Sequence, residues 1–179
     1  MRKLENSELS RPSTEEFKHL TKMPLVVVLD NVRSCHNIGS VFRTSDALLV
    51  EKIYLCGITS TPPDKEIRKT ALGAENSVAW EYHTSTSEIV SRLKEQGYLV
   101  VAIEQVEKSI SLENYVPPEN IKLALVFGNE VKGVQQEVVD VCDFALEIPQ
   151  YGTKHSFNIS VSVGIVLWDL FSKLKGRFN

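Results

Sequence analysis

A chain of 179 residues with 42% hydrophobic residues is long enough to bury one substantial core and leaves little room for a second domain. The formal net charge of −3 excludes a protein that attracts nucleic acid through its overall field, so a polyanionic partner requires a local basic patch. The N-terminus has no apolar signal region and no apolar run approaches the roughly 20 residues that cross a bilayer, so we expect a soluble protein without a membrane partner.

Three cysteines, Cys35, Cys56 and Cys142, are widely separated and form no CxxC pair. This spacing argues against both a metal site and a disulfide framework. We therefore expect a protein of the reducing cytoplasm.

Residues 1–22 form a polar arm that carries both lysines or arginines and glutamates. Ser13 followed by Glu16 predicts a capping box at the start of a short helix. A solvated surface helix and a basic arm that touches nucleic acid are both open interpretations. We expect a single domain over residues 23–179.

From Leu25 onward, apolar runs alternate with amphipathic stretches. Strands are predicted over residues 25–29, 52–56, 78–82, 98–103, 123–127 and 144–148. Helices are predicted over 37–49, 64–72 with Gly73 as C-cap, 87–96 with Gly97 after it, and 134–141. Short β-branched runs that alternate with helices indicate an α/β fold, a parallel sheet with helices on both faces.

The last long stretch begins as a loop, because Pro149 cannot donate to a strand ladder and Gly152 permits unusual backbone conformations. It continues as a helix, with Ser156 or Asn158 placed to cap the first turn. The apolar positions of that helix are Ile159, Val163, Val166, Leu167 and Leu170. A polar loop that opens into a buried helix can direct free backbone groups at a small polar ligand, so we expect one wall of a binding site here.

In parallel α/β sheets, ligands bind beyond the carboxyl ends of the strands. Three loops follow such ends, at residues 30–46, 128–133 and 149–158. None carries a GxGxxG fingerprint or P-loop spacing, which disfavours a dinucleotide oxidoreductase and an NTPase. Ser156 beside His155 suggests a hydrolase, but no GxSxG elbow is present and adjacent residues rarely face one another.

Together the three loops resemble a known family. The motifs are Asn37-x-Gly39-x-x-x-Arg43-Thr44, then Phe127-Gly128-Asn129-Glu130-Val131-x-Gly133, then Ile148-Pro149-x-x-Gly152-x-x-x-Ser156-Phe157-Asn158-Ile159-Ser160. In this order they resemble the signature motifs of the SpoU (TrmH-like) branch of the SPOUT RNA methyltransferases, over roughly residues 25–171. The departures are small: Phe157 stands where the family usually has leucine, and Ser162 where alanine is common.

The resemblance implies an α/β domain whose C-terminal part threads into a deep trefoil knot. It also implies a homodimer that packs its terminal helices together, and S-adenosylmethionine as the cofactor bound in the knot. The implied reaction is methyl transfer to a ribose 2′-hydroxyl of RNA, without a metal. Because no further RNA-binding domain is evident, we favour tRNA over rRNA as the substrate, and both stay open.

The resemblance also assigns catalytic residues. Arg43 lies at the reacting hydroxyl; since arginine stays protonated, we expect it to clamp the RNA phosphate and stabilise the developing alkoxide rather than act as a base. Asn37 would cap its helix and hold Arg43 or the ribose. Glu130 would either tie down its own loop or orient Arg43 or a dimer partner. Ser156 and Asn158 would touch the target ribose, although capping alone also explains Ser156.

For the cofactor, the resemblance implies close approach of the adenosine at Phe127 and Gly128, and main-chain contacts around Ile148, Gly152 and Phe157. Glu104, at the end of a predicted strand, either meets the cofactor or is a solvated strand-end carboxylate. Arg33 shares the rim with Arg43 and is our candidate for a further RNA contact. Lys173, Lys175 and Arg177 either complement the dipole of the last helix or extend the RNA surface.

Two other functions stay open. One is a catalytically inactive RNA-binding or ribosome-assembly module of the same fold, against which the intact Arg43, Glu130 and Asn158 argue. The other is a methyltransferase that acts on a base. Product analysis separates ribose methylation from base methylation, because a 2′-O-methyl group protects the adjacent phosphodiester from alkali and a base methyl does not.

Overall fold

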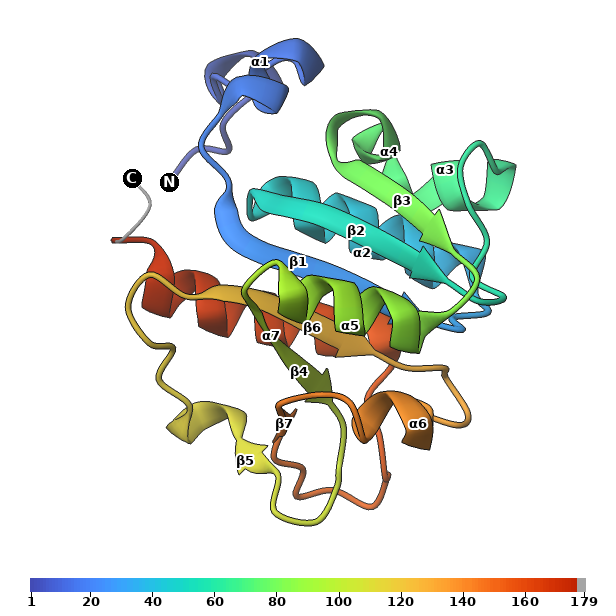
Figure 1. Ribbon diagram of the computed structural model, residues 1–179. Helices are drawn as coiled ribbons and strands as arrows, with labels where there is room; N and C mark the ends of the chain where they lie inside the picture. Colours follow the sequence, from blue (N-terminus) through green and yellow to red (C-terminus); the bar gives the residue numbers. More distant parts are fainter. Residues whose placement is uncertain (177–179) are drawn as a thin grey trace.

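The computed structural model describes residues 1–176, and their strands form one parallel sheet in the order β3-β2-β1-β6-β4-β7-β5 (Figure 1). Arg177 lies outside the described residues. The strands are β1 Met23–Asp30, β2 Val50–Cys56, β3 Ala79–His83, β4 Tyr98–Ile103, β5 Ile110–Ser111, β6 Lys122–Phe127 and β7 Phe144–Glu147. Because every pairing is parallel, all carboxyl ends meet at one edge.

Helices cover both faces of the sheet (Figure 1). They are η1 Asn6–Glu8, α1 Thr14–His19, α2 Cys35–Ala47, α3 Lys65–Ala71, α4 Ala74–Ser77, α5 Thr86–Glu95, η2 Leu112–Asn114, α6 Gln136–Val139 and α7 Ile159–Leu174. Along β1, Val27 and Leu29 pack into the core cluster that α2, α3 and α7 cover, whereas Val26 and Val28 pack into the cluster under α5 and α6. The predicted α/β architecture is confirmed. The trefoil knot stays a prediction.

Most predicted elements are present within one or two residues of their expected bounds, but three features differ. The helix predicted over 134–141 shortens to α6, because the Val134 N–H donates to Glu104 Oε2 at 3.0 Å and Gln135 is extended at φ −59° and ψ 140°. The single-turn α4 and the two-residue β5 were not predicted, since elements this short show no periodicity.

The predicted caps are right for α1 and partly wrong elsewhere. The capping box of Ser13 with Glu16 is present. Asn37 does not cap α2: Ser34 is the N-cap, and its side chain accepts from the Asn37 N–H at 3.3 Å. The sequence placed the cap three residues too late because Ser34 precedes two residues, Cys35 and His36, that carry no helical pattern of their own.

The end of α3 differs from expectation, whereas the start of α7 agrees with one of the two predicted caps. Leu72, not Gly73, is the C-cap of α3, with a left-handed φ of 53°. Gly73, at φ 97°, precedes α4. For α7, Asn158 rather than Ser156 is the N-cap, because its side chain accepts from the Ser160 N–H at 2.9 Å.

The glycine of the first motif has a packing role. Gly39 lies where α2 presses against α3, and a Cβ built there would be 2.2 Å from the Ile67 carbonyl oxygen and 2.2 Å from Thr70 Oγ1. A backbone oxygen cannot rotate away as a flexible side chain does. The α2–α3 contact therefore requires glycine at this position.

We expect Gly39→Ala to lower the free energy of unfolding by about 1–3 kcal/mol, because the overlap outweighs the better helix propensity of alanine. Urea denaturation followed by circular dichroism measures this change. Ser40→Ala, one residue along α2, is the matched control and should change the free energy of unfolding by less than about 0.5 kcal/mol. Equal stability of wild type and Gly39→Ala would show that the helices separate without cost.

Of the helices within residues 1–176, none is long and apolar enough to cross a bilayer. In the same part of the chain, no group of three histidine, cysteine, aspartate or glutamate side chains is placed to hold a metal ion.

Candidate functional site

A cavity of about 720 Å³ lies at the carboxyl ends of β4, β6 and β7. Eight of the site residues predicted from the sequence line this cavity: Glu104, Phe127, Gly128, Glu130, Ile148, Ser156, Phe157 and Asn158. Four other predicted site residues are not part of the lining: Arg33, Asn37, Arg43 and Gly152. The three motif loops thus converge on one cavity, with the first motif at its margin.

The loop after β6 closes on itself. Asn129 and Gly133 exchange two backbone hydrogen bonds of 2.9 Å, and Asn129 Oδ1 accepts from the N–H groups of Val131 and Lys132 at 2.9 and 3.1 Å. A Cβ built on Gly128 would be 2.0 Å from the Gly133 carbonyl carbon and the Val134 nitrogen. The tight loop therefore excludes any side chain at Gly128.

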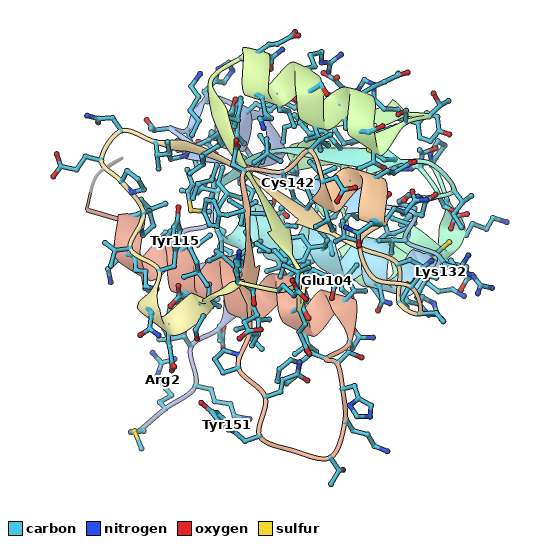
Figure 2. All side chains as sticks on the ribbon, turned by 60° about the horizontal axis from the view of Figure 1, so that its bottom comes forward. Arg2, Glu104, Tyr115, Lys132, Cys142 and Tyr151 are labelled. Atoms are coloured by element: carbon cyan, nitrogen blue, oxygen red, sulfur yellow. The ribbon has the colours of Figure 1, made fainter. Side chains whose placement is uncertain are left out.

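Glu104 joins β4 to this loop (Figure 2). Its carboxylate accepts from the Gln105 N–H at 2.9 Å and from the Val134 N–H at 3.0 Å. Gly133 has a φ of 68°, and a Cβ on it would be 2.1 Å from Glu104 Oε2. Glu104 is thus half-buried and held between backbone donors at the cavity wall, rather than a carboxylate that water alone solvates.

Glu130 connects the second motif to the first. Its carboxylate accepts from the N–H groups of Arg33 and Ser34 at 3.0 and 2.9 Å and from Asn37 Nδ2 at 3.1 Å. Partial burial by itself raises the pKa of Glu130, but these donors outweigh it and hold the pKa below its ordinary value. Glu130 is therefore ionised at neutral pH and ties the start of α2 to the loop after β6.

Asn37 extends this connection to the third motif. Asn158 Nδ2 donates to Asn37 Oδ1 at 3.2 Å. Asn158 Oδ1 accepts from the Ser160 hydroxyl at 2.7 Å and from the Ser160 backbone N–H. A continuous network thus runs from Glu130 through Asn37 to Asn158. Each of the three motifs contributes one residue to it.

Arg43 lies apart from this network. Its side chain is exposed on α2, and within residues 1–176 it has no hydrogen-bond or ion-pair partner. A helix rises about 1.5 Å per residue, so Arg43 begins about 9 Å along α2 from Asn37. Arg43 is accordingly an exposed cation on α2, outside the cavity lining. The Arg33 side chain is also exposed, and its backbone N–H donates to Glu130 at the cavity.

One buried polar group beneath the loops was not predicted from the sequence: the carboxylate of Asp30. Asp30, fully buried at the end of β1, accepts from Asn31 Nδ2 at 2.8 Å, Thr86 Oγ1 at 2.6 Å and the Gln135 N–H at 2.9 Å. Asn129 Nδ2 also donates to the Asn31 carbonyl at 2.7 Å. A carboxylate directly after an apolar strand was the available signal, since such a group requires donors when it is buried.

The similarity to known proteins extends over the region that holds the three motifs. Residues 24–168 match the model of the SpoU rRNA Methylase family. The chain is 31% identical over 151 residues to the 23S rRNA (guanosine-2′-O-)-methyltransferase RlmB of Neisseria meningitidis serogroup B; the match covers 84% of this chain but only 59% of that relative. The chain thus spans about three fifths of that relative's length.

Solved structures share the fold. The TrmH/SpoU tRNA modifying enzyme of A. aeolicus has a TM-score of 0.81 and 26% identity, over 92% of this chain and 85% of that one. The AdoMet-bound rRNA methyltransferase of Sinorhizobium meliloti has a TM-score of 0.78 and 25% identity, over 88% of this chain and 60% of that one. Because the family model matches most of the chain, from β1 into α7, the chain belongs to the SpoU rRNA methylase family.

Proposed function

We propose that this chain transfers a methyl group from S-adenosylmethionine to a ribose 2′-hydroxyl of RNA. The observation that carries the proposal is the network of Glu130, Asn37 and Asn158, which joins the three family motifs at one cavity. The names of the relatives, a guanosine 2′-O-methyltransferase and an AdoMet-bound methyltransferase, support it. An inactive RNA-binding module would not need a network that holds three motifs at one cavity.

The cavity fits the proposed cofactor in size and chemistry. A volume of about 720 Å³ is in the range of small-molecule sites. Ile103, Phe127 and Ile148 offer apolar surface to a planar base, while Glu104 and Glu130 place negative charge near a cationic ligand. When bound, S-adenosylmethionine supplies an electrophilic methyl group on a sulfonium centre. The protein residues then have to position the ribose and manage one proton.

The residues divide these tasks according to their contacts. Glu130 is engaged by three donors, so it serves to position Asn37 rather than to accept the hydroxyl proton. Asn37 and Asn158 orient one another at the cavity margin, where a ribose would enter. Arg43, always protonated, binds the phosphate next to the target ribose and stabilises charge that develops on its oxygen.

We propose tRNA as the first substrate class and rRNA as the second. The likeness to the A. aeolicus tRNA modifying enzyme supports the first, and the identity to RlmB supports the second. All three thiols, Cys35, Cys56 and Cys142, are free, which fits a protein of the reducing cytoplasm.

The proposal is tested by calorimetric titration of S-adenosylmethionine into the purified chain, followed by transfer of labelled methyl groups to bulk tRNA and to rRNA. Expected are saturable binding and label that protects the adjacent phosphodiester from alkali. Label that alkali releases normally would indicate base methylation. Absence of cofactor binding would replace the proposal with the inactive RNA-binding module.

We further propose a homodimer that packs α7 against α7. One face of α7 is buried in the core, yet Val161 and Trp168 on another face remain 48% and 62% exposed. Trp168 stacks on Phe171 with ring centroids 6.0 Å apart. Exposed apolar residues that gather on one helix face are usually covered by another surface, and a second copy of α7 would cover this face.

We expect Trp168→Glu to weaken dimerisation by roughly 30-fold or more, because buried tryptophans at interfaces contribute about 2 kcal/mol or more. Sedimentation velocity over a concentration series measures the shift. Val116→Glu, at a position 73% exposed before β6, is the control and should leave the dimer intact. A wild type that sediments as a monomer would refute the proposed interface.

A further inference from the structure

The loop between β7 and α7 differs in character from the rest of this acidic chain. Residues 149–158 contain Lys154 and His155 and no aspartate or glutamate. Residues 151–158 are all exposed. Among residues 1–176, a single hydrogen bond, from Gln105 Nε2 to the His155 carbonyl at 3.0 Å, holds the stretch 150–157. The loop thus presents free side chains to solvent.

Tyr151 is the most exposed aromatic residue of the described chain, at 91%. It points outward from the loop, with no ring or hydrogen-bond partner within residues 1–176 (Figure 2). Further along the same loop, His155 and Phe157 line the cavity, and Phe157 is itself 41% exposed. One loop therefore carries two aromatic rings and two basic side chains from the outer surface to the cavity.

The opposite lip of the cavity repeats the combination of an exposed apolar residue with a lysine. Val131 is 80% exposed and precedes Lys132, and both line the cavity. Figure 2 shows Lys132 and Tyr151 on opposite sides of Glu104. A polymer that crosses the mouth of the cavity would thus meet Lys132 in the lining on one side, and Lys154 and Tyr151 just outside the lining on the other.

We propose that an unpaired RNA segment crosses the cavity mouth here, with Tyr151 stacked on a base next to the modified ribose and Lys132 and Lys154 on its phosphates. The inference rests on the proposed function and adds a substrate class, single-stranded rather than duplex RNA. Aromatic rings stack on bases only where those bases are unpaired, and lysines neutralise the backbone. Contact between two copies of this loop is a poorer alternative, because the loop offers no acidic groups to meet its own basic ones.

The test compares the binding of a mixed-sequence 12-nucleotide RNA and of its duplex by fluorescence anisotropy, using the full chain. We expect Tyr151→Ala to weaken single-strand binding about 5- to 150-fold without changing its salt dependence, since stacking is not electrostatic. Tyr151→Phe keeps the ring and should bind within about twofold of wild type. Lys154→Ala should lower the slope of log K against log salt by about one. Lys122→Ala is the control, because Lys122 is the first residue of β6 and lies at the end of the sheet away from the cavity. This variant should leave the slope unchanged.

Cofactor titration and sedimentation of the same variants complete the experiment. Unchanged cofactor affinity and unchanged sedimentation of Tyr151→Ala support the inference. Wild type that prefers the duplex, equal RNA affinity of Tyr151→Ala, loss of cofactor affinity, or dissociation of a dimer would each overturn it. An inactive wild type refutes the proposed function, whereas an active wild type with an unimpaired Tyr151→Ala refutes only this inference.

Discussion

Arg43→Ala is expected to lower the turnover number for methyl transfer by about 100- to 1000-fold while leaving the affinity for S-adenosylmethionine within about twofold. The physical reason is the separation of roles within the site. Arg43 is exposed, lies outside the cavity lining and has no partner within residues 1–176, so its removal leaves the cavity and its network in place. What is lost is the positive charge that would stabilise the reacting oxygen.

Two further variants sharpen this prediction. Arg43→Lys keeps the charge but not the planar pair of donors, so we expect intermediate activity. Arg68→Ala removes an exposed arginine from the neighbouring α3 and should change turnover by less than about threefold, as surface charges away from the reaction do. Labelled methyl transfer at saturating cofactor measures all three variants. Cofactor affinity that falls together with turnover would place Arg43 in the cofactor wall instead.

Much of the fold was predictable because its signals are local. The strands β1, β4 and β6 are apolar runs, and α7 repeats apolar residues at helical spacing. The strand order was not predictable, because it depends on pairings such as β1 with β6, between residues nearly a hundred positions apart. The α2 cap was misplaced for a local reason, since Ser34 and Asn37 are both good caps and only the backbone geometry distinguishes them.

The site was predictable only as a set of loops. Family resemblance indicated which loops matter, yet the bonds that join them link residues 93 and 121 positions apart: Glu130 with Asn37, and Asn158 with Asn37. Contacts between residues so far apart leave no periodic pattern in the sequence. The buried Asp30 carboxylate was missed for the same reason, because its donors come from α5 and from the segment before α6.

Gly128→Ala is expected to raise the dissociation constant for S-adenosylmethionine by roughly 100-fold, which corresponds to about 3 kcal/mol. The new Cβ would overlap the backbone of Gly133 and Val134 at 2.0 Å, and backbone atoms cannot move without opening the loop. Opening it breaks the two hydrogen bonds between Asn129 and Gly133 and releases Glu130 from the start of α2. The sheet below is unaffected, so we expect only a small change in thermal midpoint.

The chain provides a matched control in the loop before α7. A Cβ on Gly152 would meet nothing within 4 Å, and Gly152 is not part of the cavity lining, so Gly152→Ala should leave the dissociation constant within about twofold. Calorimetric titration of both variants with the cofactor makes the comparison. If Gly152→Ala weakened binding and Gly128→Ala did not, the cofactor would be held by the loop before α7 rather than by the closed loop after β6. Both variants add one methyl group, which meets protein backbone at Gly128 and open space at Gly152, so the comparison shows which of the two loops the cofactor requires.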